Sequence, residues 1–546
     1  MMNKKYTLTI SILASNRKDT LPKTLESIKP ILDNVPSELI VVDTGCDEEL
    51  LEVIQQYTEN IVKFQWVKDF SKARNAGLEK AQGEWFLFID DDEWFEDVSE
   101  FIDFFNSEEK DKYGYGKYYQ RNYHNLEGSS WSDFAAGRVF RLNEGTKFVD
   151  AIHERPINIE GPVKFFEAYA HHYGYVYKTE EERQAHIERN MSLLKEQVKS
   201  QPDVARHYGH LIQEYCSTKE YDKIIENAKL GIEKADMSTI DNKKDVPGLY
   251  AAVGWALLSQ GKYDEVLQEA EVYLKKPYCN KLCEATWLAF CATAARSAGR
   301  YAECVSYVSK YFKLREYLVN HEKECHAMSA AIIIYGIEEA NCRRVATAGL
   351  VAASHIGEIE VYKLCLQYVE QVVALDNANE KDFMSMLMMA EKCGMDIGLW
   401  LKRKTLAWWM NLLDKWSVNV KVKELVEAKI VLSKVLGINN IYMQYYDVVF
   451  TEAMLIRKKL EEVTLCELQE EIQNCTDIVI GFYKNMYQSQ VFENYMSLLP
   501  VRVQVSVMLK KLCDKQQRDV KVIEKIIKLM PRFTNLVAKY KELMQK

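Results

Sequence analysis

The 546-residue sequence predicts an N-terminal α/β domain with a mostly parallel, Rossmann-like sheet, followed by an all-α helical region. The first observation behind this prediction is that short apolar runs alternate with helical segments through the first part of the chain. The second is that the sequence becomes helical from Thr179 onward, with a recurring type of helix start. We therefore expect three domains, at residues 1–178, 179–316 and 317–546.

The N-terminal part contains three strand–helix units in succession. Each apolar run is followed by a loop and a helical segment, which is the pattern of parallel strands joined by helical crossovers. The first helix is expected at Leu21 to Ile31, with Pro22 in its first turn. The expected strands are Tyr6 to Leu13, Glu38 to Val42 and Ile61 to Val67.

A fourth apolar run, Trp85 to Ile89, leads into four consecutive acids, Asp90 to Glu93. The run is short and rich in strand-favouring residues, so it predicts a buried parallel strand. Because side chains alternate along a strand, we expect Asp90 and Asp92 to face one crevice at its carboxyl end, where open α/β sheets bind ligands. Two carboxylates there suit Mg²⁺ or Mn²⁺ together with the phosphates of a nucleotide diphosphate. The alternative is an acidic turn exposed to solvent.

Two further features bear on phosphate and nucleotide binding. Neither GxGxxG nor GxxxxGK[ST] occurs in this region, so a metal is expected to bind the phosphates in place of such a loop. Asp43 ends the second expected strand, just before a Thr-Gly pair, which places a carboxylate at the same sheet edge. We expect Asp43 to accept a hydrogen bond from a base or ribose. The alternative is that it caps the helix expected from Glu48 to Tyr57.

The order of three motifs resembles that of inverting family 2 glycosyltransferases with the GT-A fold. The motifs are VVDTG from Val41, DFSKARNAG from Asp69 and FIDDDEW from Phe88. Their order and spacing are more specific than any one motif alone. After Gly45 the chain departs from the family's G-S-x-D-x-T pattern and continues Cys46-Asp47-Glu48.

The resemblance implies which residues form the site. Asp43 would contact the uracil of a UDP-sugar, and Asp90 with Asp92 would form the metal-binding DxD motif. Arg74, in the RN segment, would lie near the diphosphate. The donor-binding residues expected are Ala14, Asn16, Arg17, Asp43, Arg74, Asp90, Asp91 and Trp131, and the metal ligands expected are Asp92, Asp90 and His172.

An inverting transfer needs a carboxylate base near the acceptor nucleophile. Glu154 is the expected catalytic residue, since its IHE segment resembles the place where the family carries its base; Asp150 and Asp133 are the alternatives. The segment around His172 resembles a downstream histidine that joins the metal shell, and the alternative is an ordinary packed or surface histidine. The aromatic stretch between Lys112 and Phe148 predicts either a sugar or peptide cleft or packing at the sheet edge.

In the helical region, three segments repeat a tyrosine at a helix start, at Tyr221, Tyr263 and Tyr301. Tetratricopeptide units run about 34 residues, so these more widely spaced starts resemble irregular hairpins of that kind with longer linkers. The stretch Asp236 to Pro247 is expected to account for the first excess. After Tyr317 further helices are expected, without a clean repeat.

Composition and charge exclude several classes of function. A net charge of −9 argues against a nucleic-acid partner. No segment is long and apolar enough to span a bilayer, and polar residues interrupt the first apolar stretch, which predicts a strand and not a signal peptide. The thirteen cysteines include no CxxC pair and are expected to be reduced packing residues in a cytoplasmic protein.

Together these expectations describe a cytoplasmic, metal-dependent glycosyltransferase that moves a hexosyl or N-acetylhexosaminyl group from a UDP-sugar to a Ser, Thr or Cys side chain. The architecture resembles bacterial family 2 enzymes that glycosylate polypeptides, and the helical repeats are expected to hold part of the polypeptide acceptor. Mn²⁺ or Mg²⁺ is the expected cofactor, and a homo-oligomer is left open. The alternatives are a transferase of cell-surface glycan or lipid-linked sugar synthesis, and a catalytically inactive repeat adaptor that binds nucleotide sugars.

Overall fold

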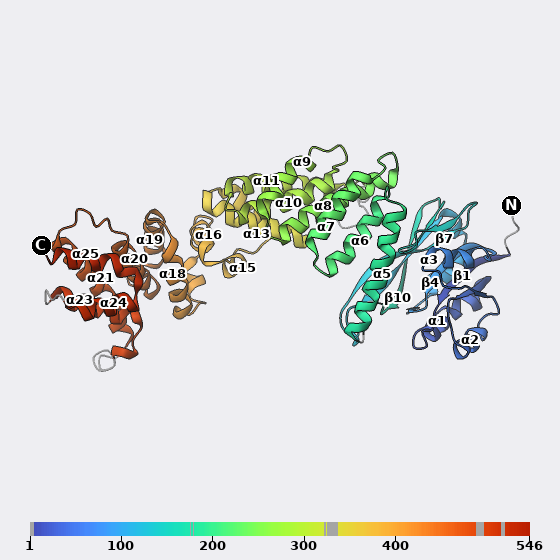
Figure 1. Ribbon diagram of the computed structural model, residues 1–546, viewed down its shortest axis with the longest axis horizontal. Coiled ribbons are helices and arrows are strands. Elements are labelled where there is room, and N and C mark those ends of the chain that lie inside the picture. Colours follow the sequence, from blue (N-terminus) through green and yellow to red (C-terminus); the bar gives the residue numbers. More distant parts are fainter. Residues whose placement is uncertain are drawn as a thin grey trace. The chain divides into compact units, whose positions relative to one another are not determined.

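The computed structural model describes residues 5–545 except 175, 178, 322–323, 325–336, 488–495 and 515–518. The described chain divides into two compact units, one comprising residues up to Gln260 and the other beginning at Gly261. The first unit contains a sheet and helices, and the described residues of the second form helices only (Figure 1). This confirms the predicted fold class, whereas the domain boundaries after residues 178 and 316 stay predictions.

The first unit is built on an eight-stranded sheet with the order β3-β2-β1-β4-β7-β6-β10-β5. Strands β3, β2, β1 and β4 are parallel to one another, as expected, whereas β7 runs antiparallel to both β4 and β6. β10 is parallel to β6 and antiparallel to β5. The strands are β1 (Tyr6–Ala14), β2 (Ser37–Asp43), β3 (Ile61–Lys63), β4 (Gly83–Asp90), β5 (Glu93–Phe95), β6 (Tyr115–Tyr123), β7 (Trp131–Arg141) and β10 (Val163–His172), and a separate hairpin pairs β8 (Lys147–Val149) with β9 (Arg155–Ile157).

The first helices follow local signals in the sequence. α1 begins at Leu21 with a proline in its first turn. Asp47 caps α2, and Asp69 caps α3, each by accepting a hydrogen bond from a backbone N–H of the first turn. The alternative that Asp43 caps α2 is therefore wrong. The helices of this unit are α1 (Leu21–Asn34), α2 (Glu48–Gln55), α3 (Phe70–Leu78), α4 (Ser99–Asn106), the 3₁₀ helix η1 (Glu108–Lys112), α5 (Glu180–Ser200), α6 (Ala205–Ser217), α7 (Tyr221–Lys234) and α8 (Ile240–Ser259).

The main apolar core packs the central strands against α1 and α4, and the strand register places the carboxyl ends of these strands at one edge. Alternate residues of β1, β2 and β4 pack with α1 and α4, and Trp85 lies edge-on to Phe104 with ring centroids 5.6 Å apart. Fully burying one such side chain stabilises the fold by roughly 1.5–3 kcal/mol. In the resulting register, Ala14 pairs with Asp43 and Leu13 pairs with Asp90. The loop after β1, the end of β2 and the acidic turn after β4 therefore meet.

Helices α7, α9 and α11 begin at Tyr221, Tyr263 and Tyr301, which confirms the predicted helix starts. The linker expected over Asp236 to Pro247 is wrong for most of its length, because α8 begins at Ile240 and passes through Pro247. In the described part of the chain, no helix has the length and apolar character needed to cross a membrane. The helices of the second unit are α9 (Tyr263–Tyr273), α10 (Lys281–Ser297), α11 (Tyr301–Asn320), α13 (Glu339–Ile356), α14 (Ile359–Cys365), α15 (Gln371–Asp376), α16 (Glu380–Lys392), α17 (Ile397–Leu401), α18 (Leu406–Asn419), α19 (Val422–Leu436), α20 (Ile441–Ile456), α21 (Leu465–Met486), η2 (Met496–Leu498), α23 (Val501–Asp514), α24 (Val520–Leu529), η3 (Pro531–Phe533) and α25 (Thr534–Leu543).

Candidate active site

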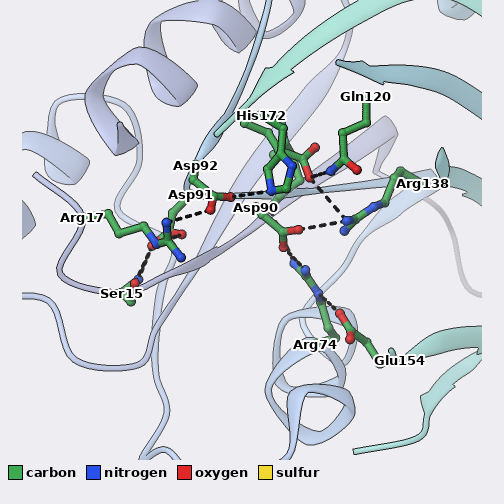
Figure 2. A network of polar contacts seen from close by, with 12 residues as sticks. Ser15, Arg17, Arg74, Asp90, Asp91, Asp92, Gln120, Arg138, Glu154 and His172 are labelled. Carbon is green, nitrogen blue, oxygen red and sulfur yellow. Dashed lines mark hydrogen bonds and ion pairs between the residues drawn. The ribbon is translucent and has the colours of Figure 1, made fainter. Parts of the chain in front are cut away.

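The acids after β4 lie in a tight turn. β4 ends at Asp90, Asp91 and Asp92 form the turn, and β5 begins at Glu93. The alternation expected of a strand therefore does not extend to Asp92. Asp90 contacts two arginines from the sheet and α3, whereas Asp92 contacts Arg17 and lies beside His172 (Figure 2).

Asp90 is held between arginines from two separate elements. Arg74 of α3 contacts Asp90 Oδ1, and Arg138 of β7 donates from Nη2 to Asp90 Oδ2 at 2.9 Å. Burial raises the pKa of Asp90, but the charges of Arg138 and Arg74 more than offset this, so its pKa lies well below its usual range. Arg138 also lies 3.3 Å from Oε1 of the fully buried Glu93, whose pKa burial raises to about 8. Asp90 thus stays ionised beside two guanidinium groups, while Glu93 favours the protonated form at neutral pH.

Arg74 also links Asp90 to Glu154. The Arg74 side chain is only 2% exposed, and its Nε lies 3.1 Å from Glu154 Oε1. The ring of Phe88 lies under the guanidinium, with the centroid 4.9 Å from Cζ. In the part of the chain that the structure describes, no hydrogen bond or ion pair engages the second carboxylate oxygen, Glu154 Oε2. The structure therefore brings the predicted base to the acidic turn through one shared arginine.

The loop after β1 binds the acidic turn from the other side. Ser15 donates to Asp91 Oδ2 from its backbone N at 2.6 Å and from its hydroxyl at 2.7 Å. Arg17 Nε lies 3.2 Å from Asp91 Oδ1, and Arg17 Nη1 lies 2.7 Å from Asp92 Oδ2. Burial raises the pKa of Asp91 to about 6, although the charge of Arg17 opposes the rise. Because the Arg17 side chain is 47% exposed, its charge is accessible to a ligand at the mouth of the site.

His172, the last residue of β10, faces Asp92. Its Nε2 lies 3.7 Å from Asp92 Oδ1, and its Nδ1 lies 2.6 Å from Oδ1 of Asn122. An amide oxygen only accepts hydrogen bonds, so Nδ1 carries the proton in this arrangement and Nε2 presents its lone pair toward Asp92. Burial lowers the pKa of His172, which favours the neutral ring. A Cβ at Gly174 would lie 2.4 Å from His172 Nε2, so only glycine fits at this position beside the ring.

The donor atoms of Asp92 and His172 fit a divalent cation. A neutral imidazole, oriented by a hydrogen bond at its other nitrogen, is a common ligand beside a carboxylate. The third expected ligand, Asp90, is instead bound by two arginines. Among the described residues, no three His, Cys, Asp or Glu side chains are grouped so that they could hold a metal by themselves. The pair would therefore share the cation with oxygens of a bound diphosphate.

Three of the other residues expected to bind the donor lie at the same sheet edge. The carbonyl of Ala14 accepts from the backbone N and the hydroxyl of Thr44 at 2.9 and 2.8 Å. Asn16 is exposed in the next loop, and its side chain accepts from a backbone N–H at 3.3 Å. Asp43 Oδ1 accepts from two backbone N–H groups of the following turn, at 2.9 and 2.8 Å. These contacts shape the edge that borders the acidic turn.

Trp131 lies on the other face of the sheet. It begins β7 with half of its surface exposed, and the guanidinium of Arg121 lies 5.4 Å from its ring centroid. On β6, Arg121 is the neighbour of Asn122, which faces His172. Since neighbouring residues of a strand point to opposite faces, Trp131 and Arg121 lie on the face of the sheet away from the acidic turn. The alternative base Asp133 lies there too, 3.1 Å from Arg121.

Three residues of this site were not expected from the sequence. Ser15 holds Asp91, Asn122 orients His172, and Arg138 joins Asp90 to Glu93. An arginine within the apolar segment of β7 was the one local signal for Arg138. Its role depends on β7 lying beside β4, which no periodicity indicates.

Residues 9–152 match the family model described as Glycosyl transferase family 2. The SPbeta prophage-derived glycosyltransferase SunS of Bacillus subtilis (strain 168) is 28% identical over 210 residues, which cover 36% of this chain and 46% of that protein. The chain thus spans about half the length of this curated relative. The match to the family model covers the β1 loop, α3 and the acidic turn.

Two further similarities are to a repeat-containing protein and to a solved structure. A TPR repeat-containing protein of Synechococcus elongatus is 31% identical over 86 residues, which cover 16% of this chain and 20% of that protein. The crystal structure of S. aureus TarS aligns with 45% of this chain and 52% of its own, at 13% identity and a TM-score of 0.27.

Proposed function

We propose that this chain, whose residues 9–152 form a family 2 glycosyltransferase domain, transfers a sugar from a UDP-sugar to a hydroxyl or thiol of a polypeptide. The observation that carries the proposal is the contact of one buried arginine, Arg74, with both Asp90 and Glu154. This contact joins the edge where nucleotides bind in open α/β sheets to a carboxylate that can serve as a base. The similarity to SunS supports the transferase, and the donor and the acceptor are part of the proposal.

Glu154 is the proposed general base. Arg74 fixes Oε1, so Oε2 remains to accept a proton. In the reaction, the acceptor oxygen or sulfur forms a bond to the anomeric carbon of the sugar, and its proton passes to Glu154 Oε2. The bond from that carbon to the diphosphate breaks on the opposite face, UDP leaves with the electron pair, and the configuration inverts. A base positioned in this way contributes about 10²–10⁴-fold to the rate.

The donor side of the site is formed by the loop after β1 and the acidic turn. Arg17 offers an exposed cation to the diphosphate, while Ser15 keeps Asp91 in place beneath it. Asp43 lies at the end of the neighbouring strand, where a base or ribose would extend. Arg74 and Arg138 balance the charge of Asp90, so a dianionic diphosphate does not meet an unpaired carboxylate there.

Asp92 and His172 would hold Mn²⁺ or Mg²⁺. Such a cation, when bound, offsets the negative charge that develops on the departing UDP. Asn122 contributes by fixing the tautomer and the direction of the His172 ring. The helical region is proposed to bind a part of the polypeptide that is remote from the reacting atoms.

The test combines donor turnover with acceptor modification. The full-length protein is incubated with a panel of UDP-sugars and Mn²⁺, and UDP release is measured with and without candidate polypeptides, whose intact masses are then determined. We expect UDP release with one sugar class and a mass increment of that sugar on the acceptor. UDP release without any mass increment would contradict the polypeptide acceptor. Absence of UDP release with every donor would contradict the transferase activity.

Calorimetry of UDP binding tests the metal separately. In the wild-type protein Mn²⁺ should strengthen UDP binding, and Asp92→Asn should abolish this dependence, because one anionic ligand is lost. A UDP affinity that is the same with and without Mn²⁺ in the wild-type protein would contradict the metal assignment.

A further inference from the structure

The loop that carries Glu154 has an unusual backbone. It spans residues 150–154 and joins β8 to β9. Asp150 and His153 have φ angles of 76° and 54°, in the left-handed region that residues other than glycine rarely adopt. Conformations of this kind persist where surrounding contacts hold them in place. The loop therefore depends on its neighbours for the direction in which it presents Glu154.

Helix α3 holds one side of this loop. The backbone N of Phe70 donates to the carbonyl of Ala151 at 2.8 Å. The side chain of Asn75 exchanges two hydrogen bonds with the backbone of Phe148, at 2.8 and 2.9 Å. Between them, Arg74 binds the Glu154 carboxylate itself. This side lies within the segment that matches the family model.

Helices α5 and α6 hold the other side. Gln197 of α5 accepts from the backbone N of Ile152 at 3.2 Å. His207 of α6 is fully buried, and its Nε2 lies 3.0 Å from Asp150 Oδ1. Three residues later, His210 stacks on His153 with ring centroids 4.2 Å apart. Each of the two left-handed residues of the loop thus contacts a histidine of α6.

We propose that His207, supported by Gln197, positions Glu154 for proton transfer, so that the first two helices of the helical region belong to the catalytic machinery. The proposal rests on the proposed role of Glu154 as the base. His207 is a positioning residue, because it contacts Asp150 and none of the residues of the acidic turn. His207 and Gln197 both lie beyond residue 152, where the match to the family model ends.

The contact with His207 is one that an apolar neighbour could not replace. Asp150 has a side chain only 9% exposed, and its other close partner, Arg155 Nε, lies 3.6 Å away. Burial raises the pKa of Asp150, but the hydrogen bond from His207 and the charge of Arg206 outweigh it and lower the pKa. Without this donor, a buried carboxylate would lack its nearest partner, and the loop would relax toward another backbone conformation. Glu154 would move with it, away from the reach that proton transfer requires.

The experiment is a double-mutant cycle between residues 207 and 154 in the full-length protein, with UDP release from the best donor as the assay. His207→Leu removes the hydrogen-bond donor to Asp150 and puts an apolar side chain in its place. His207→Gln keeps a hydrogen-bond donor of similar reach. We expect His207→Leu to lower kcat about 10- to 100-fold with little change in the KM for the donor. His207→Gln should recover most of the rate. His124→Leu, at an exposed histidine whose side chain makes no hydrogen bond within the described chain, is the matched control and should behave as wild type.

The Glu154→Gln background gives the decisive comparison. If His207 acts by placing the base, His207→Leu should change the residual rate less than about twofold there, because no base remains to be placed. An equal loss in both backgrounds would show that His207 only stabilises the fold, and would overturn the proposal. A Glu154→Gln variant as active as wild type would instead overturn the proposed base, which is a different failure.

Hydrogen exchange measured by mass spectrometry is a second test, which does not depend on turnover. In His207→Leu, the peptide covering residues 150–154 should exchange faster, whereas peptides from the centre of α6 should keep their protection. Loop exchange equal to wild type would overturn the proposal even if the rate of UDP release fell.

Discussion

Each compact unit buries a network of arginines and carboxylates, and the two networks differ in what surrounds them. In the second unit, Arg502 of α23 lies 2.9 Å from Glu452 and 2.8 Å from Asp414, and Arg532 lies 2.8 Å from the same Glu452. Burial raises the pKa of Glu452, and the two arginines oppose the rise. This network joins helices α18, α20 and α23 with η3 around the buried side chain of Glu452.

The network around Asp90 in the first unit looks similar by charge and burial. It differs because it lies at the carboxyl end of a strand, directly before a turn whose next two carboxylates reach a half-exposed Arg17. It also ends on Glu154, in a loop with two left-handed residues. A perturbed pKa therefore does not distinguish a site from a structural ion network. A position at the carboxyl end of a strand does so.

The largest expected effect is on the rate of sugar transfer, which should depend on the first network and not on the second. Glu154→Gln keeps the shape of the side chain but removes the proposed base, so sugar transfer should fall about 10²–10⁴-fold while UDP binding persists. Glu452→Gln, the matched change in the second unit, should leave the kcat of the folded protein unchanged. Steady-state rates and calorimetric UDP affinities check both variants. A comparable loss of kcat in Glu452→Gln would break the distinction.

The second effect separates the networks by stability. Arg502→Leu leaves the buried Glu452 without one of its two arginine partners, which should cost about 3–5 kcal/mol in the free energy of unfolding. The loss should appear in a thermal or denaturant transition of the second unit, and UDP affinity should remain that of wild type. If Arg502→Leu instead weakened UDP binding, the second network would be coupled to the site.

The third effect tests whether contacts behind the proposed metal ligands matter. Asn122→Leu removes the acceptor for His172 Nδ1, so the ring is free to rotate or to adopt the other tautomer. The affinity for Mn²⁺ in the presence of UDP should fall about 10- to 100-fold. Ser132→Leu is the control, because exposed Ser132 pairs with Asn122 on β7 and its side chain makes no hydrogen bond within the described chain. Equal Mn²⁺ affinity in Asn122→Leu and the control would contradict the proposal that Asn122 orients His172.

The smallest effect is a pH dependence of the first unit. Burial lowers the pKa of His153 and His210, and it lowers the pKa of His186 to about 4. Between pH about 6.5 and these folded values the unfolded chain binds more protons at these histidines, so each of them should destabilise the first unit as the pH falls. The raised pKa values of Glu93 and Asp91 act in the opposite direction, so the effect is measured as a difference from His186→Leu, which lacks one of the three histidines. In calorimetric scans from pH 7 to 5, the first-unit transition of the wild-type protein should move to lower temperature relative to that of His186→Leu, and the Arg502→Leu variant identifies the other transition. A wild-type transition that does not move to lower temperature relative to that of His186→Leu would contradict the prediction.

The sequence by itself determined the features that depend on neighbours along the chain. Apolar runs that alternate with helical segments predicted β1 to β4 and their parallel arrangement, since each signal extends over a few residues. The tyrosines at 221, 263 and 301 predicted three helix starts for the same reason. The acidic run after β4 was evident as a candidate site before its partners were known.

Only the tertiary structure decided which partner each charged group takes. β7 lies between β4 and β6, and this long-range pairing brings Arg138 to Asp90. With Arg74 on its other side, Asp90 is bound by arginines, and Asp92 is left beside His172. In the same way, α6 folds back so that His207 meets Asp150 across 57 positions of sequence. Local periodicity carries no information about such contacts, because the partner of a buried charge is chosen by competition among groups that only folding brings together.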